Sequence, residues 1–177
     1  GYRPTEESIK EIKKISQLPN VILEGIFTHF AVADIQDKAY TREQYKKFKW
    51  ICQRLKEEGV SIHLHHCCNS AAILDLPEFH DDMVRAGIIM YGLAPSDEVD
   101  IKKFNLKTVM SLKCCVDHIK VIDAGESVSY GRKFIAERPT RIASLPVGYA
   151  DGYTRMLSNK AEVLVHGKRV PQVGNIC

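Results

Sequence analysis

Residues 5–68 alternate between helical and strand patterns, and this alternation limits the possible folds more than any other feature of the sequence. Apolar residues at helical spacing predict helices over residues 5–18 and 41–58, each beginning at a threonine able to cap it. Apolar runs predict buried strands over residues 21–30 and 60–68. Strands that alternate with helices pair in parallel through crossover connections, so we expect an α/β fold for this part of the chain.

The pattern changes after Pro95. Residues 96–107 are polar and irregular, as in a linker. Short β-type runs follow, over residues 109–122, 141–148 and 161–177, with a Gly167-Lys168 turn in the last. We therefore expect three parts, an α/β part over residues 1–95, a linker over 96–107 and a mainly β domain over 108–177.

Composition limits the possible partners. The formal net charge of this 177-residue chain is +3, with the charges interspersed, which does not indicate a nucleic-acid or membrane partner. No apolar run approaches the roughly 18 residues of a membrane-spanning helix. We expect no nucleic-acid partner and no membrane span in this segment.

The cysteines do not have the spacing of a zinc site. No CxxC motif is present, and two pairs of cysteines are adjacent. Neighbouring residues on a strand point to opposite faces, so we expect that Cys67 with Cys68, and Cys114 with Cys115, do not chelate easily. We predict no metal site, and reduced thiols of the kind found in cytoplasmic proteins.

Ser70 follows a predicted strand and begins a short apolar segment that ends before Pro77. A hydroxyl beside the free N–H groups at the start of a helix is suited to binding phosphate. The alternative is that Ser70 only caps the helix.

Arg85 stands alone among apolar residues in Met83–Met90, which we predict to be a buried strand. A buried guanidinium needs an acceptor because it does not readily lose its proton. The acceptor could be a phosphate, a ring nitrogen or a carboxylate, and the structural alternative is an ion pair with Asp81 or Asp82.

Around these residues the sequence reads HCCNSA and then MVRAGIIMYGLAPS. Four further blocks accompany them in order, GIFTHFAVAD before them and AGESVSYGRKF, LPVGYADGYTR and VPQVGNIC after them. Together these blocks resemble the alanine racemase family of fold-type III pyridoxal-phosphate enzymes, and the resemblance covers essentially the whole chain. The family's block of the type VVKANAYGHG, which carries the cofactor-binding lysine, has no counterpart here.

The resemblance implies that the chain is an internal fragment. Residues 1–95 would be the last three β/α units of a TIM (β/α)₈ barrel, and residues 108–177 would begin a mainly β domain. Phosphate often binds after strands seven and eight of such a barrel, where Ser70 and the Gly87-Ile88 backbone would lie. We expect the fragment alone to be inactive because it lacks the lysine.

The resemblance also assigns roles in binding pyridoxal 5′-phosphate. Arg85 would face the pyridine nitrogen and leave it unprotonated, because a guanidinium is a poor acid. The cofactor would then be a weaker electron sink, which suits the removal and return of a single proton. His66 would orient Arg85, and His29 would lie against the pyridine ring, although a strand histidine can also be an ordinary core residue.

Two tyrosines complete the implied site. Tyr130, in SVSYG, would be the catalytic tyrosine that enters the active site of the other subunit, which implies a homodimer. A tyrosine hydroxyl has an ordinary pKa of about 10, so it acts as a base only where positive charge stabilises the phenolate. From the local sequence alone, Tyr130 could simply be a turn residue. Tyr149 would lie near the substrate at the dimer interface.

The function implied is interconversion of L- and D-alanine by a cytoplasmic bacterial isomerase that supplies D-alanine for cell-wall peptidoglycan. A serine racemase of the same fold shares every block quoted above. A metal-dependent barrel hydrolase could use His29 with the His63-x-His65 pair, although no matching acidic ligands are evident. A non-catalytic pyridoxal-phosphate-binding barrel would lack the trailing β residues.

Overall fold

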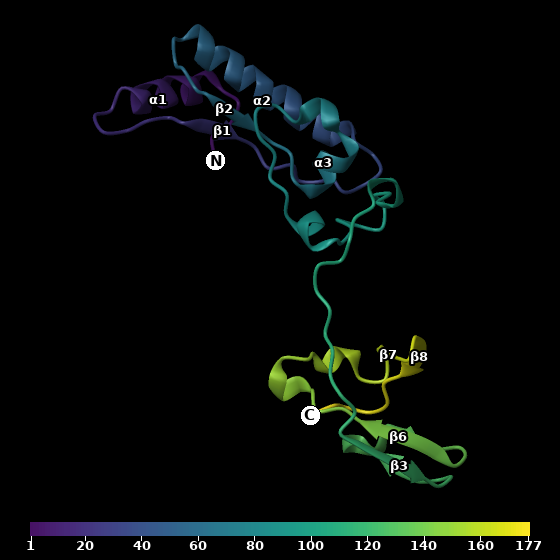
Figure 1. Cartoon of the computed structure of the whole chain (residues 1–177). Helices are drawn as coiled ribbons and strands as arrows, with labels where there is room; N and C mark the ends of the chain where they lie inside the picture. The colour runs from purple at the N-terminus through teal and green to yellow at the C-terminus, as the bar shows by residue number, and fades with distance from the viewer. The chain divides into compact units, whose positions relative to one another are not determined.

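The computed structural model describes residues 1–177 and divides them into two compact units, residues 1–111 and 112–177. Figure 1 labels most of the helices and strands. None of the helices combines the length and apolar character needed to cross a membrane. The helices are α1 (Glu6–Ser16), α2 (Ala39–Glu57) and α3 (Ser70–Asp75), and the strands are β1 (Gly25–Phe27), β2 (Leu64–His66), β3 (His118–Ile122), β4 (Ser127–Val128), β5 (Phe134–Ile135), β6 (Thr140–Ser144), β7 (Glu162–Val165) and β8 (Lys168–Pro171).

The first unit is built on the parallel pair β1–β2, as the helix–strand alternation predicts. Gly25, Ile26 and Phe27 pair with Leu64, His65 and His66 in register. Helices α1 and α2 lie along one side of this pair (Figure 1). Ile26 packs into the apolar cluster that they form, whose buried members are Ile9, Ile12, Leu55 and Val60. Since side chains alternate along a strand, Phe27 and its partner His66 lie on the opposite face of the sheet.

The two helix starts differ from each other in how well the sequence predicts them. Thr5 caps α1 as predicted, since its side chain accepts a hydrogen bond from the Ser8 N–H. The helix start and cap predicted at Thr41 are wrong, because α2 begins two residues earlier, at Ala39, and Lys38 caps it without a side-chain bond. Thr41 is instead fully buried inside α2, and its hydroxyl has no hydrogen-bond partner.

The predicted strands are shorter than the apolar runs that indicated them. Each of β1 and β2 has three residues. Met83–Met90 is not a buried strand: its backbone forms no ladder, Met90 is 66% exposed, and residues 88–91 form a 3₁₀ turn. The Arg85 N–H donates to the Cys68 carbonyl at 3.0 Å, but an isolated bond of this kind does not make a strand.

Residues 96–107, which we predicted to be a linker, contact the first unit. The Ser96 hydroxyl donates to the Asp34 carbonyl, and the Gln36 N–H donates to the Glu98 carboxylate at 2.6 Å. Val99 is buried in the cluster around Phe30. The first unit therefore continues to Ser111. A linker role for these residues in the complete protein stays a prediction.

The second unit consists of short antiparallel strand pairs joined by turns. β3 pairs with β6, β4 with β5 and β7 with β8. The β7–β8 hairpin turns at His166 and Gly167, both with positive φ, next to the predicted Gly167-Lys168 turn. The mainly β structure expected after residue 107 is thus present in this unit.

Cys67 and Cys68 depart from the strand geometry assumed for them. Both are fully buried, and both thiols donate to the same carbonyl oxygen, that of Phe79, at 3.2 and 3.1 Å. They lie just beyond β2, where the alternation of faces along the strand no longer applies. The expectation that adjacent cysteines point apart is therefore wrong for this pair, although both thiols are free as predicted.

We expect the Thr41→Val substitution to stabilise the protein, because it removes a buried hydroxyl without a partner and conserves the shape of the side chain. The gain should be about 1 kcal/mol, which raises the melting temperature by about 2–4 °C in a protein of this size. Thr5→Val is the matched control and should lower the melting temperature, because it removes a cap. Calorimetry measures both, and an unchanged or lower melting temperature for Thr41→Val would contradict the prediction.

Candidate functional site

The Arg85 guanidinium is the centre of the candidate site. Its Nη1 donates to His66 Nδ1, and its Nη2 donates to the carbonyl oxygens of Thr28 at 3.0 Å and Cys67 at 3.2 Å. Nη2 also lies 3.3 Å from His29 Nδ1. Every one of these acceptors is uncharged, so the structure brings Arg85, His66 and His29 together without a carboxylate.

The two nearby carboxylates that could have paired with Arg85 have other partners. Asp81 accepts from the Lys49 ammonium at 3.0 Å and from the Tyr45 hydroxyl at 3.1 Å. Asp82 accepts from both the backbone N–H and the imidazole of His65. An ion pair between Arg85 and either residue is therefore not formed.

The contact with Arg85 defines the protonation of His66. A guanidinium can only donate, so Nδ1 of His66 must accept, and the neutral ring carries its proton on Nε2. Burial first, and the Arg85 charge second, lower the pKa of His66 below its ordinary value of about 6.5. A neutral His66 is thus the form that the site maintains.

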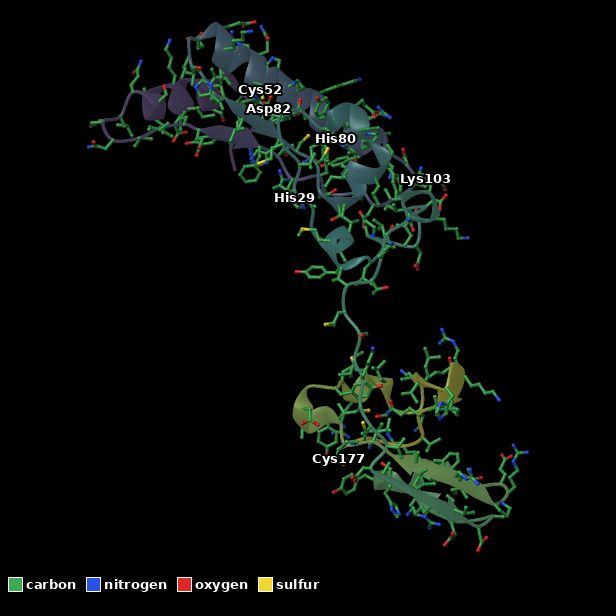
Figure 2. The ribbon with its side chains drawn as sticks, in the orientation of Figure 1. His29, Cys52, His80, Asp82, Lys103 and Cys177 are labelled. Carbon is green, nitrogen blue, oxygen red and sulfur yellow. The ribbon has the colours of Figure 1, made fainter.

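The strand register explains why these groups meet. Phe27 and His66 are paired residues of β1 and β2, and their rings stack with centroids 5.2 Å apart. The Arg85 guanidinium lies 5.3 Å from the Phe27 ring centroid. His29 follows β1 by two residues (Figure 2), so the ends of both strands deliver an imidazole to Arg85.

Ser70 and Gly87 form a second part of the site. Ser70 is buried and is the first residue of α3, while Asn69 caps that helix with its side chain. The Gly87 N–H donates to Ser70 Oγ at 2.9 Å. A Cβ at residue 87 would lie only 3.3 Å from that oxygen, so glycine allows this close approach. Ile88 begins the following 3₁₀ turn.

Tyr130 and Tyr149 belong to the second unit. Tyr130 is 69% exposed and follows Ser129, whose φ of 69° is in the left-handed region. The Arg155 guanidinium lies 5.3 Å from the Tyr149 ring centroid. A hydrogen bond with the Cys177 thiol raises the pKa of Tyr149 above its ordinary value. The predicted roles of both tyrosines stay predictions.

Three contributors to the Arg85 contacts were not identified from the sequence. Phe27 supplies the aromatic face, and Thr28 and Cys67 supply backbone carbonyls. Period-two alternation could have pointed to Phe27, which precedes His29 by two residues within the strand predicted over residues 21–30. Backbone acceptors have no signal in the sequence, because every residue carries a carbonyl.

The hydrolase alternative would use His65 as a metal ligand. The His65 imidazole is bonded to Asp82 at 2.9 Å. The structure contains no group of three or more His, Cys, Asp or Glu side chains placed to hold a metal ion.

The two parts of the site fit an aromatic nitrogen ring that carries a phosphate. Arg85 has five N–H groups, and its hydrogen bonds leave the Nε–H and one Nη1–H able to donate to a ring nitrogen. The Ser70 hydroxyl can donate to a phosphate oxygen while it accepts from Gly87. Of the first N–H groups of α3, that of Ala72 donates to the Asn69 side chain, while those of Ser70 and Ala71 have no partner within the helix.

We expect His66 to titrate below pH 6.5. The Arg85→Met substitution should raise the pKa of His66, because it removes the positive charge that, together with burial, lowers this pKa. Since the lowered pKa favours neutral His66 in the folded state, its stabilising contribution is complete above pH 6.5 and is lost as the pH falls below that value. NMR titration of the His66 ring measures the pKa. Arg42→Met is the control because Arg42 does not act on His66, and equal midpoints in the two variants would contradict the prediction.

Family comparisons agree with the motifs that surround this site. The family model described as "Alanine racemase, N-terminal domain" matches residues 1–95, and "Alanine racemase, C-terminal domain" matches residues 109–177. Alanine racemase 1 of Clostridium acetobutylicum is 55% identical over 177 residues, which are 100% of this chain and 46% of that protein. The chain thus spans about half the length of the curated relatives it matches.

Solved structures give the same result. The alanine racemase of Clostridium difficile 630 in complex with cycloserine has 44% sequence identity and a TM-score of 0.93, over 99% of this chain and 46% of that one. The alanine racemase of Bartonella henselae with covalently bound pyridoxal phosphate has 29% identity and a TM-score of 0.81, over 98% of this chain and 46% of that one. On the combined evidence of its sequence blocks, both family domains and these structures, the chain belongs to the alanine racemase family.

Proposed function

We propose that the complete protein racemises alanine with pyridoxal 5′-phosphate as cofactor, supplying D-alanine for peptidoglycan in the cytoplasm of a bacterium. The observation that carries the proposal is the Arg85 guanidinium held only by uncharged acceptors. The names of the relatives support the reaction, and the covalently bound cofactor of the Bartonella henselae enzyme supports the cofactor. We further propose that residues 1–95 complete a TIM barrel and that two subunits share each active site.

In this proposal the first unit binds and orients the cofactor. Ser70, with the Gly87 and Ile88 backbone, would hold the phosphate. Arg85 would donate to the pyridine nitrogen, while His66 fixes the guanidinium and His29 would lie beside the ring. Pyridoxal 5′-phosphate, when bound, supplies the electron sink that makes the Cα proton of an amino acid labile. Because the Arg85 guanidinium does not give up its proton, it would leave the pyridine nitrogen unprotonated and the electron sink weaker. A weaker sink suits a reaction that only removes and returns one proton at Cα.

Tyr130 would exchange that proton. We propose that its Oη, contributed by the partner subunit, takes the proton from Cα of L-alanine and returns it in the reverse direction. Racemisation needs a second acid–base group on the other face of Cα, and in the family this is the cofactor-binding lysine. Tyr149 would border the bound amino acid.

The decisive experiment supplies the protein, expressed from its complete reading frame, with the cofactor and L-alanine and measures D-alanine. Racemisation of alanine supports the proposal, and a higher kcat/KM for serine would replace it with serine racemisation. The Tyr130→Phe variant should lose about 100-fold or more of the rate, because it lacks the proton-transfer group. The exposed Tyr40→Phe variant is the control, and full activity in Tyr130→Phe would refute the assigned role.

We also expect Ser70→Ala to weaken cofactor binding about 10- to 100-fold, because the Gly87 N–H and the phosphate would both lose the hydroxyl. Absorbance titration with pyridoxal 5′-phosphate measures the Kd. Ser61→Ala, an exposed position before β2, should leave the Kd unchanged. Equal Kd values for the two variants would remove Ser70 from the phosphate site.

A further inference from the structure

Gln44, on α2, makes a set of hydrogen bonds that the family blocks do not explain. Its Nε2 donates to Thr28 Oγ1 at 2.9 Å and to the His29 carbonyl oxygen at 2.8 Å. Its Oε1 accepts from the Ala31 N–H at 3.2 Å. One side chain therefore holds three residues, Thr28, His29 and Ala31, of the segment that carries His29.

The orientation of this amide is determined by its partners. The His29 carbonyl can only accept and the Ala31 N–H can only donate, so a flipped amide would place like groups together. Both Nε2 hydrogens and the Oε1 oxygen are used. Gln44 is half-buried and lies one helical turn before the buried Phe48, so α2 carries the amide on the side that packs against the core.

Two short routes connect Gln44 with the Arg85 guanidinium. Thr28 is held by Gln44 through its hydroxyl and accepts from Arg85 Nη2 through its carbonyl at 3.0 Å. His29 is held by Gln44 through its carbonyl and faces Arg85 Nη2 with its ring. Thr28 and His29 make no strand-to-strand hydrogen bonds, since β1 ends at Phe27. The side chain of Gln44 therefore replaces the sheet hydrogen bonds that these residues lack.

We propose that Gln44 is a positioning residue of the cofactor site: it clamps Thr28–Ala31 to α2 and so holds His29 and the Thr28 carbonyl against Arg85. This inference rests on the proposed function for its catalytic consequence, but the clamp itself can be measured without cofactor. Gln44 contacts neither Arg85 nor the phosphate-binding residues, so it acts through Thr28 and His29.

The principal variant is Gln44→Met, which has similar length, no charge and no hydrogen-bonding amide. Gln53→Met is the matched control, because Gln53 is an exposed glutamine of the same helix whose amide donates to Glu57, within that helix, at 2.9 Å. Both proteins are expressed from the complete reading frame. The first measurement, without cofactor, is hydrogen exchange at the Ala31 amide and NMR of the Arg85 guanidinium. We expect at least tenfold faster Ala31 exchange and a shifted Arg85 signal in Gln44→Met alone.

The second measurement adds pyridoxal 5′-phosphate. We expect about tenfold weaker cofactor binding in Gln44→Met, with a shifted absorption maximum of the bound cofactor and a lower kcat at nearly unchanged KM for alanine. A residue that only stabilised the fold would lower the melting temperature and leave the absorption maximum in place. Behaviour of Gln44→Met identical to that of Gln53→Met in exchange, spectrum and kcat would overturn the proposal.

If Gln44→Met fails to fold, a second pair of variants changes Thr28, the residue whose hydroxyl accepts from Gln44. Thr28→Val removes the hydroxyl and keeps the carbonyl that accepts from Arg85, whereas Thr28→Ser keeps both. Thr28→Val should reproduce the shifted Arg85 signal and Thr28→Ser should restore it; equal signals in both would overturn the clamp. If the exchange results hold but the unaltered protein neither binds the cofactor nor racemises alanine, the proposed function fails while the clamp stands.

Discussion

A guanidinium surrounded by uncharged acceptors is the interaction on which the rest of the site depends. Arg85 retains its charge, yet its contacts are two imidazole nitrogens and two backbone carbonyls. Such acceptors satisfy N–H groups without neutralising the positive charge, so the guanidinium remains able to attract an anion or a ring nitrogen. All four acceptors lie on β2 or just beyond the ends of β1 and β2, so the position of each strand end is important for the site.

The sheet separates structural contacts from site contacts. Ile26 faces α1 and α2, and the apolar clusters on that side hold the helices. Phe27 and His66 lie on the other face, where they stack and meet Arg85. Because adjacent residues of one short strand serve the two purposes, a shift of register by one residue would exchange them. The parallel pairing of β1 with β2 is therefore required by the site as much as by the fold.

The sequence predicts the elements and chemical groups of this chain better than their exact geometry. The Thr5 cap and the parallel α/β order follow from local patterns, and the structure confirms both. Arg85 was identifiable because a lone charge in an apolar run needs a partner. The strand expected at Met83–Met90 was wrong, because strand formation depends on a partner ladder and not on the apolar run alone. The cap expected at Thr41 was wrong as well: Thr41 is buried inside α2, two residues after its first residue, and its hydroxyl has no hydrogen-bond partner.

Neighbouring residues bind the two carboxylates that could otherwise pair with Arg85. Asp81 and Asp82 precede Arg85 by only four and three residues, so each could in principle neutralise it. Lys49 and Tyr45, both on α2, hold Asp81, and His65 holds Asp82 through two hydrogen bonds. The His65 bonds also lower the pKa of Asp82, so this carboxylate stays ionised and firmly bonded where it is. His65 and His66 are adjacent on β2 and point to opposite faces: one holds the acid on the helix side, and the other holds the guanidinium on the site side. The alternation of a three-residue strand thus keeps the carboxylate and the guanidinium apart, which preserves the positive charge of Arg85.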